Sequence, residues 1–181
     1  MTQYIDKYLD ESLRVAKLQL ELKPTFLEIA NQVLERVLQD GTVFFCGNGG
    51  SAADSQHLAA ELVGRFKKNR KPIRSISLTT DTSIITSTGN DFSFDEIFSR
   101  QLTAIGRKGD VLIAISTSGE SKNVINAVNY ANEIGMLTIA FTKKDDNSLS
   151  SITKLCLPIP SQETGVIQQG HITFGQLLCY F

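Results

Sequence analysis

The chain has 181 residues, of which 41% are hydrophobic, so it is long enough to bury the core of one domain. Its formal net charge of −1 at pH 7 excludes a broad electrostatic attraction to nucleic acid or to a membrane surface. No apolar run reaches the length of a membrane span, and the acidic N-terminal segment lacks the features of a signal peptide. We therefore expect a cytoplasmic protein without a nucleic-acid or membrane partner.

Two helices are predicted first, over residues 3–20 and 25–39, with Pro24 at their junction. In the first, apolar side chains recur broadly at helical spacing. The two helices exceed what a minimal α/β sheet needs, and their surplus apolar surface indicates packing on another subunit. We expect a single domain, 1–181, in which residues 1–40 serve in oligomerisation.

From Gly41 onwards, short apolar runs alternate with helical segments. Each run is typical of a buried parallel strand. The runs cover residues 43–46, 73–78, 111–115, 137–141 and 155–159. This alternation predicts an α/β fold, in which a five-stranded parallel sheet is flanked by helices and preceded by the two extra N-terminal helices.

The three cysteines, Cys46, Cys156 and Cys179, are odd in number and far apart. Their spacing does not fit a disulfide framework or a thiolate metal site, and we expect all three to be buried as small hydrophobic residues. A cluster of basic residues is best explained as a solvated loop. It comprises Lys67, Lys68, Arg70, Lys71 and Arg74.

The segment 43–65 contains a strand, a glycine-rich turn and a helix. The turn would present backbone N–H groups and the positive end of the helix dipole to an anion. His57 and Glu61 follow four residues apart on one helix face, as metal ligands or acid/base partners would need to. A hydrogen-bonded structural histidine and a solvated glutamate would show the same spacing, so the pattern leaves both interpretations open.

A second polar turn, Ser116-Thr-Ser-Gly-Glu-Ser121, follows the predicted strand 111–115. Hydroxyl groups and a glycine gathered at the start of a helix suit a phosphate monoester, which needs many short donors. A plain helix cap would need only one hydroxyl group, so the composition favours phosphate binding. The segment 109–119 resembles 41–51. The chain has no Walker lysine and no Gly-x-Gly-x-x-Gly fingerprint, so a nucleotide is weakly supported.

Two further polar segments admit a functional and a structural interpretation. Asn90 and Asp91 form a predicted turn that either caps the following helix or binds sugar hydroxyl groups. In the last predicted helix, Gln168, His171 and Gln176 could address one broad face. The same helix carries enough Ile, Phe and Leu side chains to be explained by packing alone.

Together these segments resemble the phosphoheptose isomerases, sugar isomerase (SIS) domain proteins that interconvert sedoheptulose 7-phosphate and a manno-heptose 7-phosphate. The resemblance extends over nearly the whole chain and rests chiefly on the long and specific motif Cys46-Gly-Asn-Gly-Gly-Ser-Ala-Ala-Asp-Ser-Gln-His57. The Ser-Thr-Ser-Gly loop alone would indicate only the wider SIS class. Further matching segments are Ala60-Glu-Leu-Val-Gly-Arg65, Leu78-Thr-Thr-Asp-Thr-Ser83, Gly89-Asn-Asp91, Phe98-Ser-Arg-Gln101 and Ile115-Ser-Thr-Ser-Gly119.

The resemblance implies a single SIS domain and an aldose–ketose isomerase that forms D-glycero-D-manno-heptose 7-phosphate, through an enediolate, for the lipopolysaccharide core. Glu61 is the expected base. The resemblance also implies one zinc ion per subunit, held by His57, Glu61 and Gln168, and a homotetramer with active sites between subunits. The implied contacts to the sugar phosphate are Asn48, Gly49, Gly50, Glu61, Asn90, Asp91, Ser116, Thr117, Ser118, Ser121 and Gln168.

The C-terminal helix departs from the family pattern, which typically reads Thr-Ala-Arg-Ile-Gln-Glu-x-His. This chain reads Thr164-Gly-Val-Ile-Gln-Gln-Gly-His171, with Val166 and Gln169 in place of the arginine and the glutamate. Gln176 occupies the position of a further histidine, a zinc ligand and acid/base residue of the family. Glutamine cannot relay protons and is a poor zinc ligand. The alternative is therefore a non-catalytic SIS protein that binds a sugar phosphate or regulates a partner such as a replication initiator.

Overall fold

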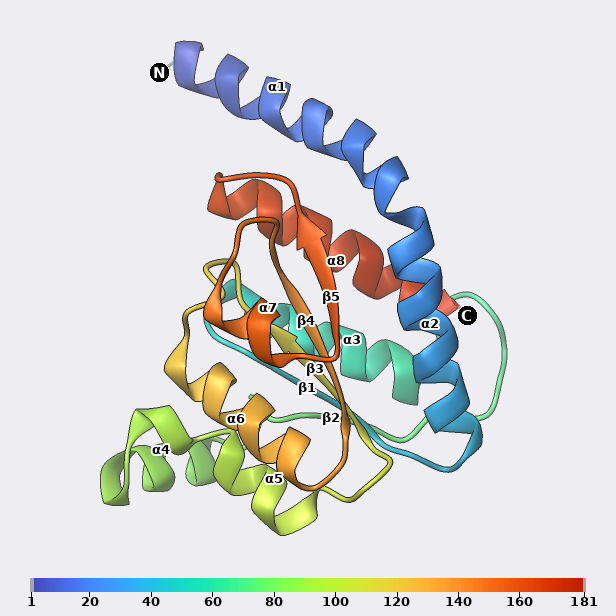
Figure 1. The fold of residues 1–181 in the computed structure, drawn as a ribbon, viewed down its shortest axis with the longest axis vertical. Coiled ribbons are helices and arrows are strands. Elements are labelled where there is room, and N and C mark those ends of the chain that lie inside the picture. Colours follow the sequence, from blue (N-terminus) through green and yellow to red (C-terminus); the bar gives the residue numbers. More distant parts are fainter. Residues whose placement is uncertain (1, 181) are drawn as a thin grey trace.

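Five strands form the central sheet of the computed structural model, which describes residues 2–180. Their order is β2-β1-β3-β4-β5 and all neighbouring pairs are parallel. The predicted α/β fold with a five-stranded parallel sheet is therefore confirmed (Figure 1). The strands are β1 (Val43–Gly47), β2 (Ser75–Ser77), β3 (Val111–Ile115), β4 (Leu137–Lys143) and β5 (Leu155–Ile159).

Helices cover both faces of the sheet, because successive strand residues point to opposite sides and both sides are apolar. Phe45 and Ile113 belong to the core on one face, and Phe44 and Leu112 to the core on the other. The first face is covered by α2 (Lys23–Leu38), α3 (Gly50–Val63) and α8 (Thr164–Tyr180). The second is covered by α5 (Ser99–Ile105), α6 (Lys122–Glu133) and α7 (Ser148–Ile152). A short helix, α4 (Thr82–Asp91), and the 3-10 turn η2 (Phe94–Glu96) lead from β2 to α5.

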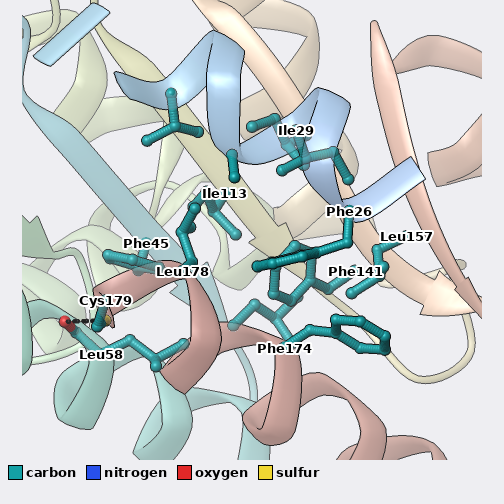
Figure 2. Close-up of a cluster of buried hydrophobic side chains, with 14 of the residues drawn as sticks. Phe26, Ile29, Phe45, Leu58, Ile113, Phe141, Leu157, Phe174, Leu178 and Cys179 are labelled. Atoms are coloured by element: carbon teal, nitrogen blue, oxygen red, sulfur yellow. Dashed lines mark hydrogen bonds between the residues drawn. The ribbon is translucent and has the colours of Figure 1, made fainter. Parts of the chain in front are cut away.

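The core on the first face fixes how α8 lies against α3 (Figure 2). The rings of Phe26 on α2 and Phe174 on α8 pack with centroids 5.2 Å apart. The thiol of Cys179 donates a hydrogen bond of 3.7 Å to the carbonyl oxygen of Leu58 in α3. A Cβ atom on Gly175 would lie 2.5 Å from a methyl group of Leu58. Because α8 touches α3 this closely, the polar residues of the two helices can form one site.

The N-terminal helices differ from the prediction in their junction. α1 (Thr2–Leu18) continues through the 3-10 turn η1 (Gln19–Leu22) into α2, and Pro24 lies in the first turn of α2 instead of between the helices. Proline is tolerated there because the N–H groups of a first turn have no partner within the helix. α1 extends away from the sheet (Figure 1) and buries only Val15 among its described residues. No helix within residues 2–180 combines the length and the apolar character of a membrane span.

Two local predictions are wrong, both at the edges of the sheet. The predicted strand 73–78 shortens to β2, because the N–H group of Ile73 donates to the carbonyl oxygen of Leu62 in α3 and not to a strand. Cys156 is only partly buried, because it lies on the edge strand β5, whereas Cys46 and Cys179 are buried as expected. All three cysteines are free thiols.

Candidate active site

The turn between β1 and α3 brings backbone groups to the carboxyl edge of the sheet. Gly49 has a φ of 55° and a ψ of −120°, a conformation that favours glycine. A Cβ atom on Gly47 would lie 2.7 Å from the Cβ atom of Ser51, and one on Gly50 would overlap the side-chain amide of Gln168. The glycines therefore permit both the tight turn and the approach of α8. The N–H groups of Ser51, Ala52 and Ala53 donate to the carbonyl oxygens of Asn48 and Gly49. The N–H groups of Gly49 and Gly50 have no backbone partner among residues 2–180 and are left for a ligand at this edge.

The hydroxyl loop, defined as residues 116–121, lies beside this turn because β3 is paired with β1. The hydroxyl oxygen of Ser116 lies 3.4 Å from that of Ser118 and 3.2 Å from that of Ser121. Ser121 occupies the N-cap position of α6, but its side chain makes no capping hydrogen bond. Thr117, which lies between Ser116 and Ser118 in the sequence, is half-buried. The hydroxyl groups of Ser116, Ser118 and Ser121 thus lie close together, an arrangement that suits a phosphate. Ser116 and Ser118 also accept the N–H groups of Gly119 and Glu120, which shapes the loop.

Contacts from α7 hold the hydroxyl loop in place. Gly119 has a φ of 73°, and the side chain of Asn147 fills the space that a Cβ atom on Gly119 would need. The N–H group of Leu149 donates to the carbonyl oxygen of Gly119 at 3.0 Å. The carboxylate of Glu120 accepts hydrogen bonds from the hydroxyl and N–H groups of Ser148, at 2.6 and 2.8 Å, and these bonds lower the pKa of Glu120. The loop therefore keeps its shape through contacts within the chain.

His57 and Glu61 point toward each other on α3, as their spacing predicts. The distance from Nε2 of His57 to Oε1 of Glu61 is 3.4 Å, and the side chains are 49% and 19% exposed. Arg70, in the basic loop, donates to the carbonyl oxygens of Glu61 and Leu62 at 3.0 and 2.8 Å and so holds the last turn of α3. The other basic residues of that loop are exposed, as expected for a solvated segment.

Asp54 belongs to the same site, and the sequence analysis did not find it. This carboxylate is buried, and its Oδ2 atom has no hydrogen-bond partner among residues 2–180. Burial raises the pKa of Asp54, while a hydrogen bond with the Gln168 side chain and the nearby His57 oppose the rise. Asp54, His57 and Glu61 are spaced i, i+3 and i+7, which places them on one helix face. That spacing is the pattern by which the sequence could have revealed Asp54.

The sequence left two interpretations open for the polar residues of α8, and the structure separates His171 from Gln168. Gln168 reaches Gly50 and Asp54. His171 is fully buried and packs near Phe141, with ring centroids 6.1 Å apart. Burial lowers the pKa of His171 to about 4, which the Thr142 backbone opposes, so its imidazole is neutral at pH 7. The packing interpretation holds for His171, which cannot touch a substrate in this arrangement.

The other residues of α8 that differ from the family pattern either pack against other elements or face solvent. Val166 is buried in the core. The amide of Gln169 donates to the hydroxyl oxygen of Tyr8 in α1 at 3.3 Å, and that hydroxyl group fills the space beside Gly165. These residues therefore fasten α8 to the core and to α1. Gln176 is partly exposed and makes no hydrogen bond with the described part of the chain.

Asn90 and Asp91 are the last two residues of α4, so the predicted polar turn is wrong. The amide of Asn90 donates to the carboxylate of Asp91 at 2.8 Å, and both residues are exposed. The following turn, η2, is capped by Ser93, whose hydroxyl oxygen accepts the N–H group of Asp95 at 2.9 Å. Within the described residues of one chain, the side chains of Asn90 and Asp91 hydrogen-bond only to each other.

Comparison with known proteins identifies the family. A model of the SIS domain matches residues 4–143. The phosphoheptose isomerase of Rhodospirillum rubrum is 51% identical over 156 residues, which are 86% of this chain and 83% of that protein. The phosphoheptose isomerase of Aquifex aeolicus is 46% identical over 179 residues and 94% of each chain is covered. This chain belongs to the phosphoheptose isomerases of the SIS domain family.

The structure agrees with this family assignment. The phosphoheptose isomerase of Neisseria gonorrhoeae superposes with a TM-score of 0.92 at 39% identity, over 99% of this chain and 96% of that one. The resemblance drawn from the sequence motifs is therefore confirmed, as are the single SIS-type fold and the class of enzyme, an isomerase. Because the likeness covers nearly the full length of both chains, it includes the hydroxyl loop and the His57–Glu61 face together.

Proposed function

We propose that this phosphoheptose isomerase interconverts sedoheptulose 7-phosphate and D-glycero-D-manno-heptose 7-phosphate through an enediolate, in the synthesis of the lipopolysaccharide core. One observation carries the proposal: the hydroxyl loop and the start of α3 lie at the carboxyl edge of the paired strands β3 and β1. A loop suited to phosphate and the helix that bears His57 and Glu61 thereby leave the sheet side by side. An isomerase of sugar phosphates needs both a phosphate anchor and a proton-transfer group.

The hydroxyl loop is the proposed phosphate anchor. Ser116, Thr117, Ser118 and Ser121 supply hydroxyl donors, and Asn48, Gly49 and Gly50 supply amide and backbone N–H donors from the neighbouring turn. Fixing the distal phosphate orients the reacting carbons and lowers the entropy cost of the reaction. Asn90 and Asp91, which are exposed in one chain, are proposed to complete a site at a subunit boundary.

Glu61 is the proposed base. Interconversion of an aldose and a ketose moves a proton between adjacent carbon atoms, and a carboxylate can accept it from one carbon and return it to the other. Glu61 is one-fifth exposed and lies 3.4 Å from His57, so the imidazole can hold its orientation. Gln168 is proposed to contact the substrate, from its place beside Gly50 and Asp54.

The donor atoms present meet only part of what a zinc ion needs. His57 and Glu61 supply an imidazole and a carboxylate that lie next to each other and open to solvent. Residues 2–180 contain no group of three His, Cys, Asp or Glu side chains that could hold a metal, so the proposed set needs the amide oxygens of Gln168 and Gln176. Amide oxygen is a weak ligand for zinc, and we expect correspondingly weak binding. A bound zinc ion would polarise the substrate oxygens.

A homotetramer is the proposed assembly, with α1 in its interface. α1 carries large apolar side chains that stay mostly exposed within the described part of the chain; these are Tyr4, Ile5, Leu9 and Leu13. An exposed apolar helix of this kind is typical of a surface buried by another subunit. Light scattering should give four times the mass of 19.9 kDa, and a monomer would contradict this part of the proposal. We place the enzyme in the cytoplasm, where its free thiols would stay reduced.

The activity is tested by following the conversion of sedoheptulose 7-phosphate by the parent protein, the Glu61→Gln variant and the Glu28→Gln variant, with zinc added and with zinc chelated. Glu28 is an exposed carboxylate on α2 and serves as the matched control. We expect turnover that Glu61→Gln lowers by about 10²-fold or more and that Glu28→Gln leaves unchanged. Absence of turnover by the parent, even with zinc, would favour the non-catalytic alternative, a protein that binds sugar phosphate or a partner.

A further inference from the structure

A reciprocal pair of amides joins the turn after β1 to the first turn of α6. Nδ2 of Asn48, in the turn after β1, donates to Oδ1 of Asn123 at 2.9 Å, and Nδ2 of Asn123 donates to Oδ1 of Asn48 at 2.9 Å. Asn123 lies in the first turn of α6, directly after the hydroxyl loop, and is 2% exposed. Asn48 is half-buried. The buried member of the pair therefore lies on α6, directly after the hydroxyl loop, and the accessible member lies in the turn after β1.

The orientation of this pair is determined by the backbone. The N–H group of Val124 donates to Oδ1 of Asn123 at 3.0 Å. An N–H group can only donate, so the oxygen atom of Asn123 must face it, and the amide nitrogen must face Asn48. Asn48 must then direct its own oxygen atom at Asn123. The order of atoms in both amides thus follows from one backbone group of α6.

The side-chain amide of Asn48 has two N–H groups. One donates to Asn123, and the other has no partner among the described residues. It lies on the accessible member of the pair, in the turn beside the hydroxyl loop. We propose that Asn123 is a positioning residue, which holds Asn48 so that it presents this N–H group, and not its carbonyl oxygen, to an oxygen atom of the sugar phosphate. This inference rests on the proposed function. Asn123 itself is too buried to touch the substrate.

The consequence for binding is that Asn123 acts only through Asn48. Without Asn123, the amide of Asn48 is free to rotate and to turn its oxygen atom toward an oxygen-rich ligand, where it would repel instead of bind. Loss of one hydrogen bond to a charged or hydroxyl oxygen atom corresponds to about tenfold in affinity. Because the same contact exists in the bound substrate and in the transition state, the effect should fall on KM and leave kcat nearly unchanged.

A double-mutant cycle tests this dependence. The variants are Asn123→Ala, Asn48→Ala and the combination of both, assayed for KM and kcat with sedoheptulose 7-phosphate. We expect Asn123→Ala to raise KM about tenfold in the parent and less than about twofold in the Asn48→Ala protein. An equal increase in both proteins would show a merely structural role and overturn the inference. If Asn123→Ala does not fold, Asn123→Ser replaces it, because serine is small and is favoured near the start of a helix.

Asn126→Ala is the matched control. Asn126 lies on the same helix, is half-buried, and donates its amide to the carbonyl oxygen of Asp95 at 3.0 Å, with no hydrogen bond to either loop. Its loss should destabilise α6 to a similar degree and leave KM within about twofold of the parent value. A rise in KM equal to that of Asn123→Ala would attribute the effect to α6 as a whole and contradict the inference.

A crystal structure of the Asn123→Ala protein tests the positioning apart from the proposed function. We expect the Asn48 side chain to leave its present orientation or to occupy more than one. An Asn48 side chain that stays in place would overturn the inference, whatever the substrate. If Asn48 moves but the parent protein neither binds nor converts sedoheptulose 7-phosphate, the proposed function fails while the positioning of Asn48 stands.

Discussion

Gln168 on α8 occupies the space that a side chain on Gly50 would need at the start of α3. Gly50, in the turn after β1, is therefore needed for the space that it leaves and not for a left-handed backbone. It admits the amide of Gln168, which also lies near the buried carboxylate of Asp54 and opposes the rise in its pKa. This contact connects the last helix of the chain to the first loop of the site.

Replacement of Gly50 by alanine should impair activity more than stability. The added Cβ atom would displace the Gln168 amide, the far end of a flexible side chain, so the free energy of unfolding should change by about 1 kcal/mol or less. Turnover should fall about tenfold, because Gln168 leaves Asp54 and the substrate. Urea denaturation and the isomerase assay measure the two effects. Gly89→Ala is the control, because its Cβ atom would meet only Ile97 at 4.0 Å; an equal loss of activity in both variants would refute the argument.

Replacement of Asp54 by asparagine should leave the fold at least as stable at pH 7 and reduce activity. Burial raises the pKa of Asp54 above its ordinary value. The stability linked to this carboxyl group is therefore fully present below the pKa of the unfolded chain and is lost as the pH rises through the folded pKa. Asparagine carries no charge and avoids that loss. Denaturation at pH 7 should show no loss of stability in the variant, and a clear loss would mean that the charged form is the one the fold stabilises.

The activity of the same variant should fall, because asparagine can neither ionise nor exchange a proton beside His57. We expect a decrease in kcat of about tenfold or more, with a smaller change in KM. Asp81→Asn supplies a control for loss of a carboxylate near the sheet. Asp81 is exposed and caps α4 by accepting the N–H group of Ile84 at 2.9 Å, and asparagine can do the same.

The sequence predicted the fold closely because strands and helices leave local patterns. The apolar runs 111–115 and 155–159 match β3 and β5. β3 is buried along its whole length, and a strand covered on both faces needs such a continuous apolar stretch. The edge strand β2 has no such requirement, and an unforeseen hydrogen bond from Ile73 to α3 decides where it begins. The i, i+4 spacing of His57 and Glu61 likewise predicted a contact within one helix.

Contacts between elements were harder to predict. The approach of Gln168 to Asp54 depends on how α8 packs along α3, and the burial of His171 depends on which face of α8 meets β4. Neither follows from spacing within α8, because Gln168 and His171 both fall within one broad arc of that helix. The Asn48–Asn123 pair joins residues 75 apart in sequence, and only the pairing of β1 with β3 brings them together.

Stability should fall as the pH decreases from about 6.5 toward 4, because of His171. Burial lowers the pKa of His171 from 6.5 to about 4, so between these values the unfolded chain binds a proton that the folded chain does not. The stability is full above pH 6.5 and should decline by about 2 kcal/mol between pH 7 and pH 5. Urea denaturation of the parent and of His171→Leu at both pH values measures this. The variant should show a smaller decline, and an equal decline in both proteins would assign the effect to other groups.

Gln176→His should raise isomerase activity and give it a new dependence on pH. Gln176 is partly exposed on α8, beyond Gln168, and makes no hydrogen bond that the substitution would break within the described residues. Glutamine cannot exchange a proton near pH 7, whereas a positioned acid or base contributes about 10²–10⁴-fold to a rate. We expect kcat to rise about 10²-fold. The plot of kcat against pH should also gain a new transition near the pKa of an accessible histidine. Thr173→His, at an exposed position of the same helix, is the control and should have no effect. If the parent is already fast and Gln176→His changes nothing, another group transfers the second proton, and the search moves to the residues that a neighbouring subunit would bring to Glu61.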